Sequence, residues 1–390
     1  MTGEQFLLLP GPTPIPDRVL RAMNKPMINH RGPEFKDIIL EVIEGAKEIY
    51  KTKHNLLVYP SSGTGALEAA IVNFLSPGDK VLAISIGVFG QRFAKIARGF
   101  GAQVEEIKVE WGKALDPQML KDRIAKDHKA EIKAILITHN ETSTGVFNEV
   151  DLLKGVLGDH PALIIVDAVS SLAALDVRMD EWGLDVVISG SQKAFMVPPG
   201  LGLIAFNERA LKAHEESKMP KFYWDINLGM QYLEKGQTPF TPAISIFYGL
   251  QESVRMMLEE GVENIIDRHL RYREMVRLSI KEMGLDLLAS DHNASPAVTS
   301  VKAPPGIGAD QIRKIMLDDY NIVLAGGQQS LENVIFRIGH LGYVRELDLL
   351  AVLAALEMTL VKLGYELELG CGIKKAQSLL FKNLLNRKEN

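Results

Sequence analysis

Cysteine is almost absent from the sequence: Cys371 is the only one among 390 residues. A single thiol excludes a disulfide framework, and it excludes any multi-cysteine metal or iron–sulfur site. Cys371 lies between Gly370 and Gly372, outside every motif described below, so we expect a structural or exposed thiol. This use of cysteine fits a reducing, cytoplasmic compartment.

Long apolar runs are also missing. The stretch Leu349–Leu356 is followed by Glu357 and is too short to cross a bilayer, which takes about 20 apolar residues. The run Phe6–Leu9 stops at Pro10 and is shorter than the roughly 7–15 apolar residues of a secretory signal. We therefore expect a soluble protein with no membrane partner.

Neither sign of charge dominates. The sequence has 44 Lys and Arg residues against 49 Asp and Glu residues, a net charge of −5, so nothing indicates a nucleic-acid partner. An apolar fraction of 46% with 24% charged residues is typical of globular proteins. At roughly 150 residues per domain, the length predicts two or three domains.

The middle of the chain contains short apolar runs that alternate with amphipathic segments. The runs are mostly uninterrupted, which is typical of parallel strands buried on both faces. They are Leu56–Tyr59, Val81–Ile84, Ala134–Ile137, Leu163–Val166, Val186–Ile188 and Leu203–Phe206. Helical patterns such as Ala66–Leu75 lie between them. This alternation predicts an α/β protein with a large, doubly wound, mostly parallel sheet.

The two ends of the chain differ from this middle part. Four prolines between residues 10 and 16 predict an irregular N-terminal arm over residues 1–16. From Thr241 onward helical patterns dominate, with strand candidates at Ala297–Val301 and Val334–Ile338. We expect a large domain over residues 17–260 and a smaller C-terminal α+β domain over residues 261–390.

The first candidate site follows the strand Leu56–Tyr59. Residues 60–65 read Pro-Ser-Ser-Gly-Thr-Gly and lead into a helix. Free backbone N–H groups, the helix dipole and hydroxyl side chains at such a point favour an anion. The segment lacks the third glycine of a dinucleotide-binding fingerprint and the Gly-Lys of a P-loop. It is either a plain capped helix or a site for a phosphate that is not part of a dinucleotide.

Two further strands end near ionisable residues. Leu163–Val166 is followed by Asp167, and burying a carboxylate costs free energy unless a group pairs with it. Asp167 either bonds to a loop or holds a protonated heterocyclic nitrogen. Val186–Ile188 leads through a Gly/Ser turn to Lys193. Lys193 is either a solvated loop lysine or an amine whose pKa is lowered by burial, as Schiff-base lysines require.

Together these three features match the needs of pyridoxal phosphate. A lysine binds the cofactor, an acid partners its pyridine nitrogen, and a helix N-terminus holds its phosphate. The combination indicates this cofactor more strongly than any one of the three.

The sequence resembles the class V aminotransferases of fold type I, specifically the serine–pyruvate/alanine–glyoxylate aminotransferase branch. The matching segments run nearly from end to end. They are Pro10–Pro12, Asn29–Phe35, Ser62–Glu68, Thr138–Gly145, Val166–Ser171, Ser189–Ala194, Pro198–Gly200, Thr238–Pro242 and Phe336–Gly339. The resemblance implies the fold type I architecture and pyridoxal 5'-phosphate as cofactor.

The resemblance also implies roles for individual residues. Lys193 is similar to the lysine that holds the cofactor and moves a proton between it and the substrate. Asp167 resembles the partner of the pyridine nitrogen, and Val169 resembles the residue packed on the ring face. The residues similar to the phosphate-binding set are Ser62, Gly63, Thr64 and Gln192.

The same resemblance implies a second subunit. Thr142 is similar to the residue beside the ring hydroxyl, whereas Thr238 and Thr241 match the segment that reaches the phosphate from a partner. A homodimer with shared active sites is therefore implied. Phe89 stands where many members of the branch stack a tryptophan on the ring, and its flat apolar face can serve there.

Arg337 interrupts an apolar strand candidate, and a buried guanidinium needs an anionic partner. That partner is either an internal carboxylate or the carboxylate of a substrate, which arginine binds in a bidentate manner. The resemblance favours the substrate α-carboxylate. The pair His30 and Arg31 either closes over the site or serves packing.

The resemblance implies transamination between a small amino acid, alanine or serine, and a small 2-oxo acid, glyoxylate or pyruvate. The reaction would follow ping-pong half-reactions through a lysine aldimine. Two alternatives stay open: another class V activity, such as a cysteine desulfurase or a lyase, and a non-catalytic partner subunit with this fold. A desulfurase needs a mobile catalytic thiol, and Cys371 lies outside the expected region.

Overall fold

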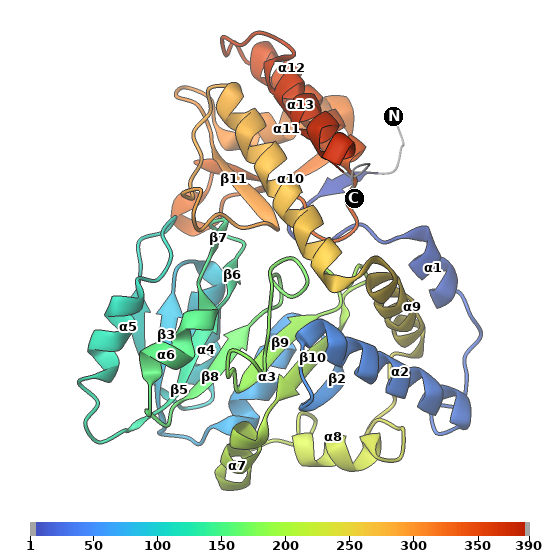
Figure 1. Ribbon diagram of the computed structural model, residues 1–390, viewed down its shortest axis with the longest axis vertical. Helices are drawn as coiled ribbons and strands as arrows, with labels where there is room; N and C mark the ends of the chain where they lie inside the picture. Colours follow the sequence, from blue (N-terminus) through green and yellow to red (C-terminus); the bar gives the residue numbers. More distant parts are fainter. Residues whose placement is uncertain (1–4, 387–390) are drawn as a thin grey trace.

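Figure 1 shows the computed structural model, which describes residues 5–386. A seven-stranded sheet lies in the lower, wider part of the molecule, and a four-stranded sheet lies in the upper part. The N-terminal and C-terminal segments both lie beside the upper part, on one side of it.

The seven-stranded sheet has the order β2-β10-β9-β8-β5-β3-β4. Its strands are β2 (Asn55–Ser61), β3 (Lys80–Ser85), β4 (Gln103–Lys108), β5 (Ile132–Thr138), β8 (Leu163–Asp167), β9 (Val186–Gly190) and β10 (Gly200–Phe206). Neighbouring strands are parallel except at β10, which is antiparallel to β2 and β9. The predicted α/β fold with a large, mostly parallel sheet is confirmed.

The apolar runs form these strands because both faces of the sheet are covered. In β3, Leu82 and Ile84 pack into the core on one face, while Val81 and Ala83 pack into the core on the other. The first face is covered by α2 (Pro33–Tyr50), α5 (Pro117–Ile124), α6 (Leu153–Leu157) and α9 (Ile244–Glu260). The second face is covered by α3 (Gly63–Phe74), α4 (Val88–Gly99), α7 (Glu208–Glu216) and α8 (Ile226–Leu233). No helix in the described part of the chain is long and apolar enough to cross a membrane.

The four-stranded sheet has the order β1-β12-β13-β11. Its strands are β1 (Phe6–Leu8), β11 (Val298–Lys302), β12 (Ile322–Gly326) and β13 (Ile335–Gly339). A third core joins this sheet to the helices of the C-terminal part. Those helices are α10 (Val262–Glu282), α11 (Ala309–Tyr320), α12 (Glu346–Lys362) and α13 (Cys371–Asn386).

The N-terminal segment differs from the irregular arm expected for it. Phe6–Leu8 form β1, which pairs in parallel with β12, and Leu8 is buried in the third core. Pairing with β12 makes this segment a strand, and the local sequence alone does not indicate that pairing. Pro10 follows β1 after one residue, and the chain then runs without regular structure to α1 (Asp17–Met23).

The division of the chain at residue 260 remains a proposal. α9 ends at Glu260, and Gly261 separates it from α10 with φ +86°. Strands β2 to β10 precede this point and β11 to β13 follow it, which supports a boundary there. Only β1 belongs to the sheet on the other side of the boundary.

Candidate active site

The three groups predicted at strand ends lie at one edge of the large sheet. β8 and β9 are parallel neighbours, and β10 is antiparallel to both β9 and β2, so β2, β8 and β9 run in the same direction. Their carboxyl ends therefore share an edge. A Cβ on Gly63 would lie only 2.7 Å from Cγ2 of Val169, so the loop after β2 touches the turn after β8.

The loop after β2 presents uncapped helix donors. Ser62 precedes α3 in an extended conformation, with φ −90° and ψ 172°, and no side chain caps the helix. The N–H groups at the start of a helix have no intrahelical partner. With the hydroxyls of Ser62 and Thr64 beside them, they form a place for an anion. The alternative of a helix capped by its own side chain is not what the structure contains.

The side chain of Gln192 lies beside this loop. Its Oε1 atom is buried and has no hydrogen-bond partner in the described chain. A Cβ on Gly190 would lie 2.9 Å from this oxygen and 3.2 Å from the backbone nitrogen of Gly63. An unpaired buried polar group costs about 1–3 kcal/mol, so a bound polar group here would relieve that cost.

Lys193 follows β9 and is half-buried under the N-terminal segment. Its Nζ donates to the carbonyl of Pro10 at 2.6 Å, and Oγ1 of Thr13 donates to the carbonyl of Lys193 at 3.0 Å. Burial lowers the pKa of Lys193 to about 8, although the negative charge of Asp167 acts in the opposite direction. The lysine is therefore not a solvated loop residue.

Asp167 ends β8 and is 4% exposed. Its Oδ1 accepts from the backbone N–H of Val169 at 3.0 Å, and its Oδ2 accepts from Oγ1 of Thr138 at 3.4 Å. Burial raises the pKa of Asp167 to about 6, against the effect of these hydrogen bonds and of the charges of Lys193 and Arg92. The hydrogen bond from Val169 is the bond to a loop that one of the two interpretations of Asp167 predicts. A further positive charge next to Asp167 would stabilise its ionised form.

Arg337 lies in β13 and reaches across to the large sheet. Its Nε donates to the carbonyl of Gly326 at 2.8 Å, and its Nη1 donates to the carbonyl of Thr142 at 2.6 Å. No carboxylate of the described chain forms an ion pair with it, so the alternative of an internal carboxylate partner is not met within residues 5–386. Burial lowers the pKa of Arg337 to about 10, and the charge of Glu141 opposes this shift. Nη2 makes no hydrogen bond within residues 5–386.

Thr142 occupies the turn of a short hairpin formed by β6 (Asn140–Glu141) and β7 (Val146–Phe147). Thr142 is 2% exposed. Glu141, beside it, is fully buried and accepts from the backbone N–H groups of Phe89 and Gly90 at 3.0 Å each. The hairpin thus contacts both α4 and Arg337.

Phe89 and Arg92 lie one turn apart on α4. The guanidinium carbon of Arg92 lies 4.7 Å from the centre of the Phe89 ring, and Nη1 of Arg92 lies 3.5 Å from Oγ1 of Thr64. Arg92 thus brings a positive charge to the loop after β2. Sequence reasoning missed Arg92 as a site residue. Its spacing of three residues from Phe89 could have indicated it, because residues three apart lie on the same face of a helix.

Thr238 and Thr241 are not brought to this group. Oγ1 of Thr238 donates to the carbonyl of Phe240 at 2.7 Å, and the carbonyl of Thr238 accepts from Nη1 of Arg31 at 2.7 Å. Thr241 is exposed. Arg31 therefore orders the segment around Thr238, and neither threonine hydrogen-bonds to Lys193 within the described chain.

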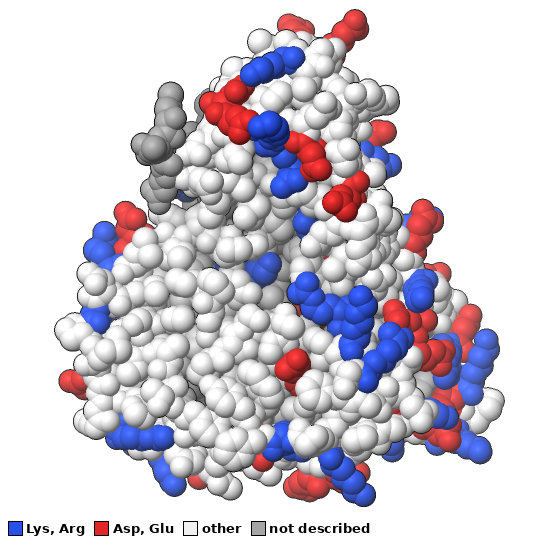
Figure 2. All heavy atoms as spheres, turned by 180° about the vertical axis from the view of Figure 1, so that it is seen from behind, with Lys and Arg blue, Asp and Glu red and all other residues white. Residues whose placement is uncertain are grey.

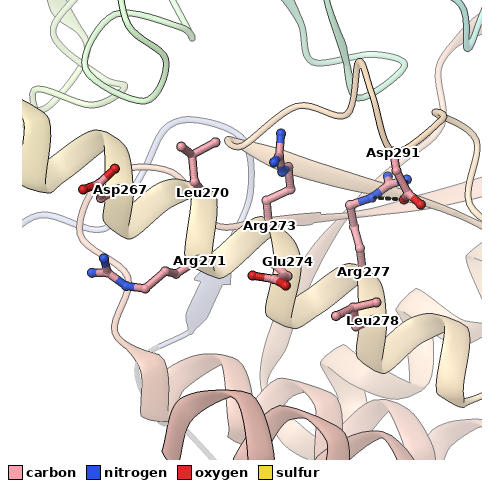
Figure 3. Close-up of a pocket in the computed structure, with 8 residues that line it drawn as sticks. All are labelled: Asp267, Leu270, Arg271, Arg273, Glu274, Arg277, Leu278 and Asp291. Atoms are coloured by element: carbon pink, nitrogen blue, oxygen red, sulfur yellow. Dashed lines mark hydrogen bonds and ion pairs between the residues drawn. The ribbon is translucent and has the colours of Figure 1, made fainter. Parts of the chain in front are cut away.

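A cavity of about 550 Å³ lies elsewhere, along α10. Figure 3 shows its lining, in which Arg277 points to Asp291 of the loop after α10. The lining residues are Asp267, Leu270, Arg271, Arg273, Glu274, Arg277, Leu278 and Asp291. None of the candidate residues from the strand ends belongs to this cavity, so volume alone does not identify the active site.

Comparisons with known proteins agree on one family. The sequence pattern of the family described as aminotransferase class-V matches residues 5–346. A protein of Anabaena cylindrica named soluble hydrogenase 42 kDa subunit is 44% identical over 96% of this chain and 98% of its own length. Serine–glyoxylate aminotransferase of Arabidopsis thaliana is 39% identical over 97% of this chain and 96% of its own length.

Solved structures give the same result. The crystal structure of ureidoglycine–glyoxylate aminotransferase from Bacillus subtilis superposes with a TM-score of 0.91 at 32% identity. The match covers 97% of this chain and 99% of that chain. The similarity therefore includes both sheets and the helices around them.

Proposed function

The chain belongs to the class V aminotransferases, and from this membership we propose that it transfers an amino group between a small amino acid, alanine or serine, and glyoxylate or pyruvate. It is an enzyme that depends on pyridoxal phosphate. One observation carries the proposal that transamination takes place at this site: Asp167, Lys193 and Arg337 are buried or half-buried, the charges of the other two act on Lys193, and none of the three has an ion-pair partner in the described chain.

Pyridoxal phosphate, when bound, supplies an aldehyde that reacts with amines and a ring that withdraws electrons from the substrate. We assign its phosphate to the loop after β2 and to Gln192. The uncapped first turn of α3 and the partnerless Oε1 of Gln192 support this assignment. The loop residues concerned are Ser62, Gly63 and Thr64.

The remaining contacts involve the end of β8, the start of α4 and the turn between β6 and β7. We assign Asp167 to the ring nitrogen, because it ends β8 as a buried carboxylate without an ion-pair partner in the described chain, and burial raises its pKa to about 6. Val169 and Phe89 are assigned to the ring faces. Thr142 is assigned to the ring hydroxyl.

Lys193 is the group that moves the proton. With a pKa of about 8, part of the Lys193 side chain is a free amine near neutral pH, so its Nζ could accept the proton from the α-carbon of the amino acid and carry it to the bound cofactor. The carbonyl of Pro10 holds Nζ at 2.6 Å and limits its orientation. Asp167 favours the charged form electrostatically, which keeps the pKa within a useful range.

Arg337 is the group that binds and orients the amino acid. Two carbonyls hold its Nε and Nη1 without neutralising its charge. Nη2 is left to bind an α-carboxylate, for which arginine geometry is well suited. A carboxylate held there brings the α-carbon to a fixed position relative to Lys193.

The names of two relatives support glyoxylate as the acceptor, since both name it and they differ only in the donor. The test is a panel of alanine, serine and aspartate, each with glyoxylate and with pyruvate, ranked by kcat/KM. We expect alanine or serine with glyoxylate to rank first. A preference for aspartate, or no turnover with any pair, would overturn this proposal.

We further propose that the enzyme is a cytoplasmic homodimer with shared active sites. Thr241 is exposed, and Phe222 beside Phe240 is 74% exposed, as a partner-facing segment requires. Figure 2 shows a wide area with few charged side chains on the back of the large sheet region, which also suits an interface.

Light scattering and a mixing experiment test the dimer. The mass should be about twice 43.1 kDa. Subunits carrying Lys193→Ala and subunits carrying Thr241→Arg should each be inactive, yet mixed dimers should regain activity because one of their two sites is intact. A monomeric mass or the absence of this recovery contradicts shared sites.

The name of the Anabaena cylindrica relative favours a second candidate, a subunit of a soluble hydrogenase. A purely structural subunit would not need the ionisable residues described above. If the parent protein shows transaminase turnover and the Lys193→Ala variant does not, the result supports the enzyme. If the parent protein shows no turnover and Lys193→Ala leaves hydrogenase assembly unaffected, the result supports the subunit.

The structure gives no support to desulfurase chemistry. The thiol of Cys371 lies 3.9 Å from Oε1 of Glu357, and burial together with that carboxylate raises its pKa. A catalytic thiol needs the opposite shift. Cys371→Ala should therefore retain full activity, and its loss would revive this alternative.

A further inference from the structure

Glu141 is a fully buried carboxylate to which no role has been assigned above. Its Oε2 accepts from the backbone N–H groups of Phe89 and Gly90, and its Oε1 accepts from the N–H of Ser143 at 3.2 Å and from its hydroxyl. The hydroxyl of Ser143 also accepts from the N–H of Val88 at 3.0 Å. Glu141 and Ser143 together thus satisfy three donors at the start of α4.

The chemistry of this cluster requires a carboxylate. The backbone N–H groups can only donate, so both oxygens of Glu141 must accept, and the N-terminal end of α4 favours a negative charge. The contact also depends on Gly87, where a Cβ would lie 2.4 Å from Oγ of Ser143 and 2.5 Å from Cγ of Glu141. No larger residue at this position permits the approach.

The same cluster fixes the residue between its two members. Glu141 and Ser143 flank Thr142, so holding both of them to α4 fixes the direction of the Thr142 carbonyl. That carbonyl accepts from Nη1 of Arg337 at 2.6 Å. Phe89 lies on α4, which packs on the large sheet, whereas Arg337 lies in β13 of the small sheet, and they are linked through this one hairpin turn.

The hairpin is also tied to the C-terminal part by its backbone. The N–H of Phe147 donates to the carbonyl of Asn293 at 3.0 Å, and the N–H of Ser295 donates to the carbonyl of Gly145 at 2.9 Å. These bonds leave the turn little freedom to compensate for the loss of Glu141. Its charge also acts on Arg337 and favours the charged guanidinium.

We propose that Glu141 is a positioning residue of the aminotransferase reaction, which keeps the ring-face residue Phe89 and the carboxylate-binding Arg337 in one fixed relation. The inference rests on the proposed function, because it assumes that these two residues face cofactor and substrate. Glu141 acts through them and touches neither ligand itself.

The test compares Glu141→Gln with the parent holoenzyme by two independent readouts. The first is the ratio of kcat/KM for alanine to that for ethylamine, which lacks the carboxylate that Arg337 binds. The second is the circular dichroism of the bound cofactor in its visible band, which reports how the ring is held. We expect the ratio to fall about tenfold or more and the dichroism to change, since a shift near 1 Å costs about 100-fold in rate.

Three further variants separate coupling from local damage. Arg337→Lys should change the ratio alone, and Phe89→Leu should change the dichroism alone. Glu106→Gln is the matched control, because Glu106 also accepts from a serine hydroxyl, Ser85 at 2.8 Å, but contacts α4 only at its far end, through an ion pair with Arg98 at 2.6 Å. It should change neither readout.

Hydrogen exchange supplies a readout that needs no turnover. In the cofactor-free protein, Glu141→Gln should speed exchange at the amides of residues 88–90. If Glu141→Gln does not fold, Ser143→Ala replaces it, with smaller changes of the same kind in all three readouts. If Glu141→Gln, or Ser143→Ala in its place, changes only one of the first two readouts or loses thermal stability alone, the proposal is overturned.

The outcome is distinguishable from a failure of the proposed function. If the parent protein turns over no amino donor, the proposed function fails. The dichroism and hydrogen exchange still decide whether Glu141 holds α4 and the hairpin turn together.

Discussion

Two regions of the molecule handle buried charge in opposite ways. Around Lys193, the ionisable groups lack direct ion-pair partners within the described chain, and burial lowers the pKa of Lys193 to about 8. On α10, Arg277 is 5% exposed but is neutralised by Asp291, which accepts from its Nε at 3.1 Å and its Nη2 at 2.6 Å. Lys281 and Arg277 lower the pKa of Asp291 to about 2.

The difference separates charge held for a ligand from charge held for the fold. Unpartnered buried ions raise the free energy of the folded protein until a ligand of opposite charge arrives. Paired ions offer a ligand nothing. The Arg277–Asp291 pair beside the cavity in Figure 3 is of the second kind, and the site at the strand ends is of the first. Substitutions in the two regions should have opposite signatures.

The largest contrast is expected between two lysines. Lys193→Ala should lower turnover by about 10⁴-fold or more, because a covalent anchor and a proton carrier are both lost. The purified variant should also lack the yellow absorbance of the parent at roughly 400–430 nm, for which the cofactor is the chromophore. Lys281→Ala, on α10, should behave as the parent does. Full transaminase activity in Lys193→Ala would contradict the mechanism.

Asp167→Asn should lower turnover by about 10²–10³-fold, as the loss of a strong electrostatic contact does. It should also lower the pKa of Lys193 below 8, because the charge of Asp167 favours the protonated amine. Labelling of the cofactor-free protein with trinitrobenzenesulfonate, followed at Lys193 by mass spectrometry against pH, measures this. The parent should show a midpoint near 8, with faster labelling above it. An unchanged or higher midpoint in the variant would disprove the coupling.

Arg337→Gln should raise KM for the amino acid by about 10–100-fold, the value of one or two charged hydrogen bonds, with a smaller effect on kcat. Arg277→Gln provides the matched arginine on α10. It should leave KM unchanged and lower the free energy of unfolding. Steady-state kinetics and thermal unfolding are measured for both variants. An equal rise of KM in both would contradict the distinction between a substrate-binding Arg337 and a structural Arg277.

The smallest effect is expected for Asp291→Asn, with activity within twofold of the parent and a loss of about 1 kcal/mol in unfolding free energy. Because the folded pKa of Asp291 lies below the ordinary value of 3.8, its contribution is present above pH 4 and is lost as the pH falls toward 2. Thermal unfolding against pH measures this: the parent and the variant should converge in acid. A constant difference would show that the carboxylate acts through something other than its charge.

Sequence reasoning identified the candidate residues that lie at the carboxyl ends of the strands. Asp167 and Lys193 directly follow or lie shortly after buried apolar runs, and parallel strands bring such ends together. Arg337 was recognisable because it interrupts an apolar run. The local sequence pattern was sufficient to predict a residue's place in the fold wherever that place follows from the strand that contains or precedes it.

The remaining features depend on contacts between distant segments. Glu141 accepts from the N–H group of Phe89, which lies 52 residues earlier in the sequence. The residues next to Glu141 in the sequence do not indicate which N–H groups will donate to it. The bond from Lys193 to Pro10 uses a backbone carbonyl, which every residue has. β1 was missed because its partner strand lies near the other end of the chain. Such contacts have no local signature in one sequence.

The cover over Lys193 has a consequence for the order of folding. Pro10 and Lys193 are 183 residues apart, and Pro10 is held near its position by β1, whose one partner is β12. Closing so long a loop costs chain entropy before any contact repays it, so such contacts form late. As the chain emerges from the ribosome, the large sheet is complete well before β12 exists. The lysine is therefore accessible to an aldehyde in solution until β12 has formed, so the cofactor can reach it before the chain has finished folding.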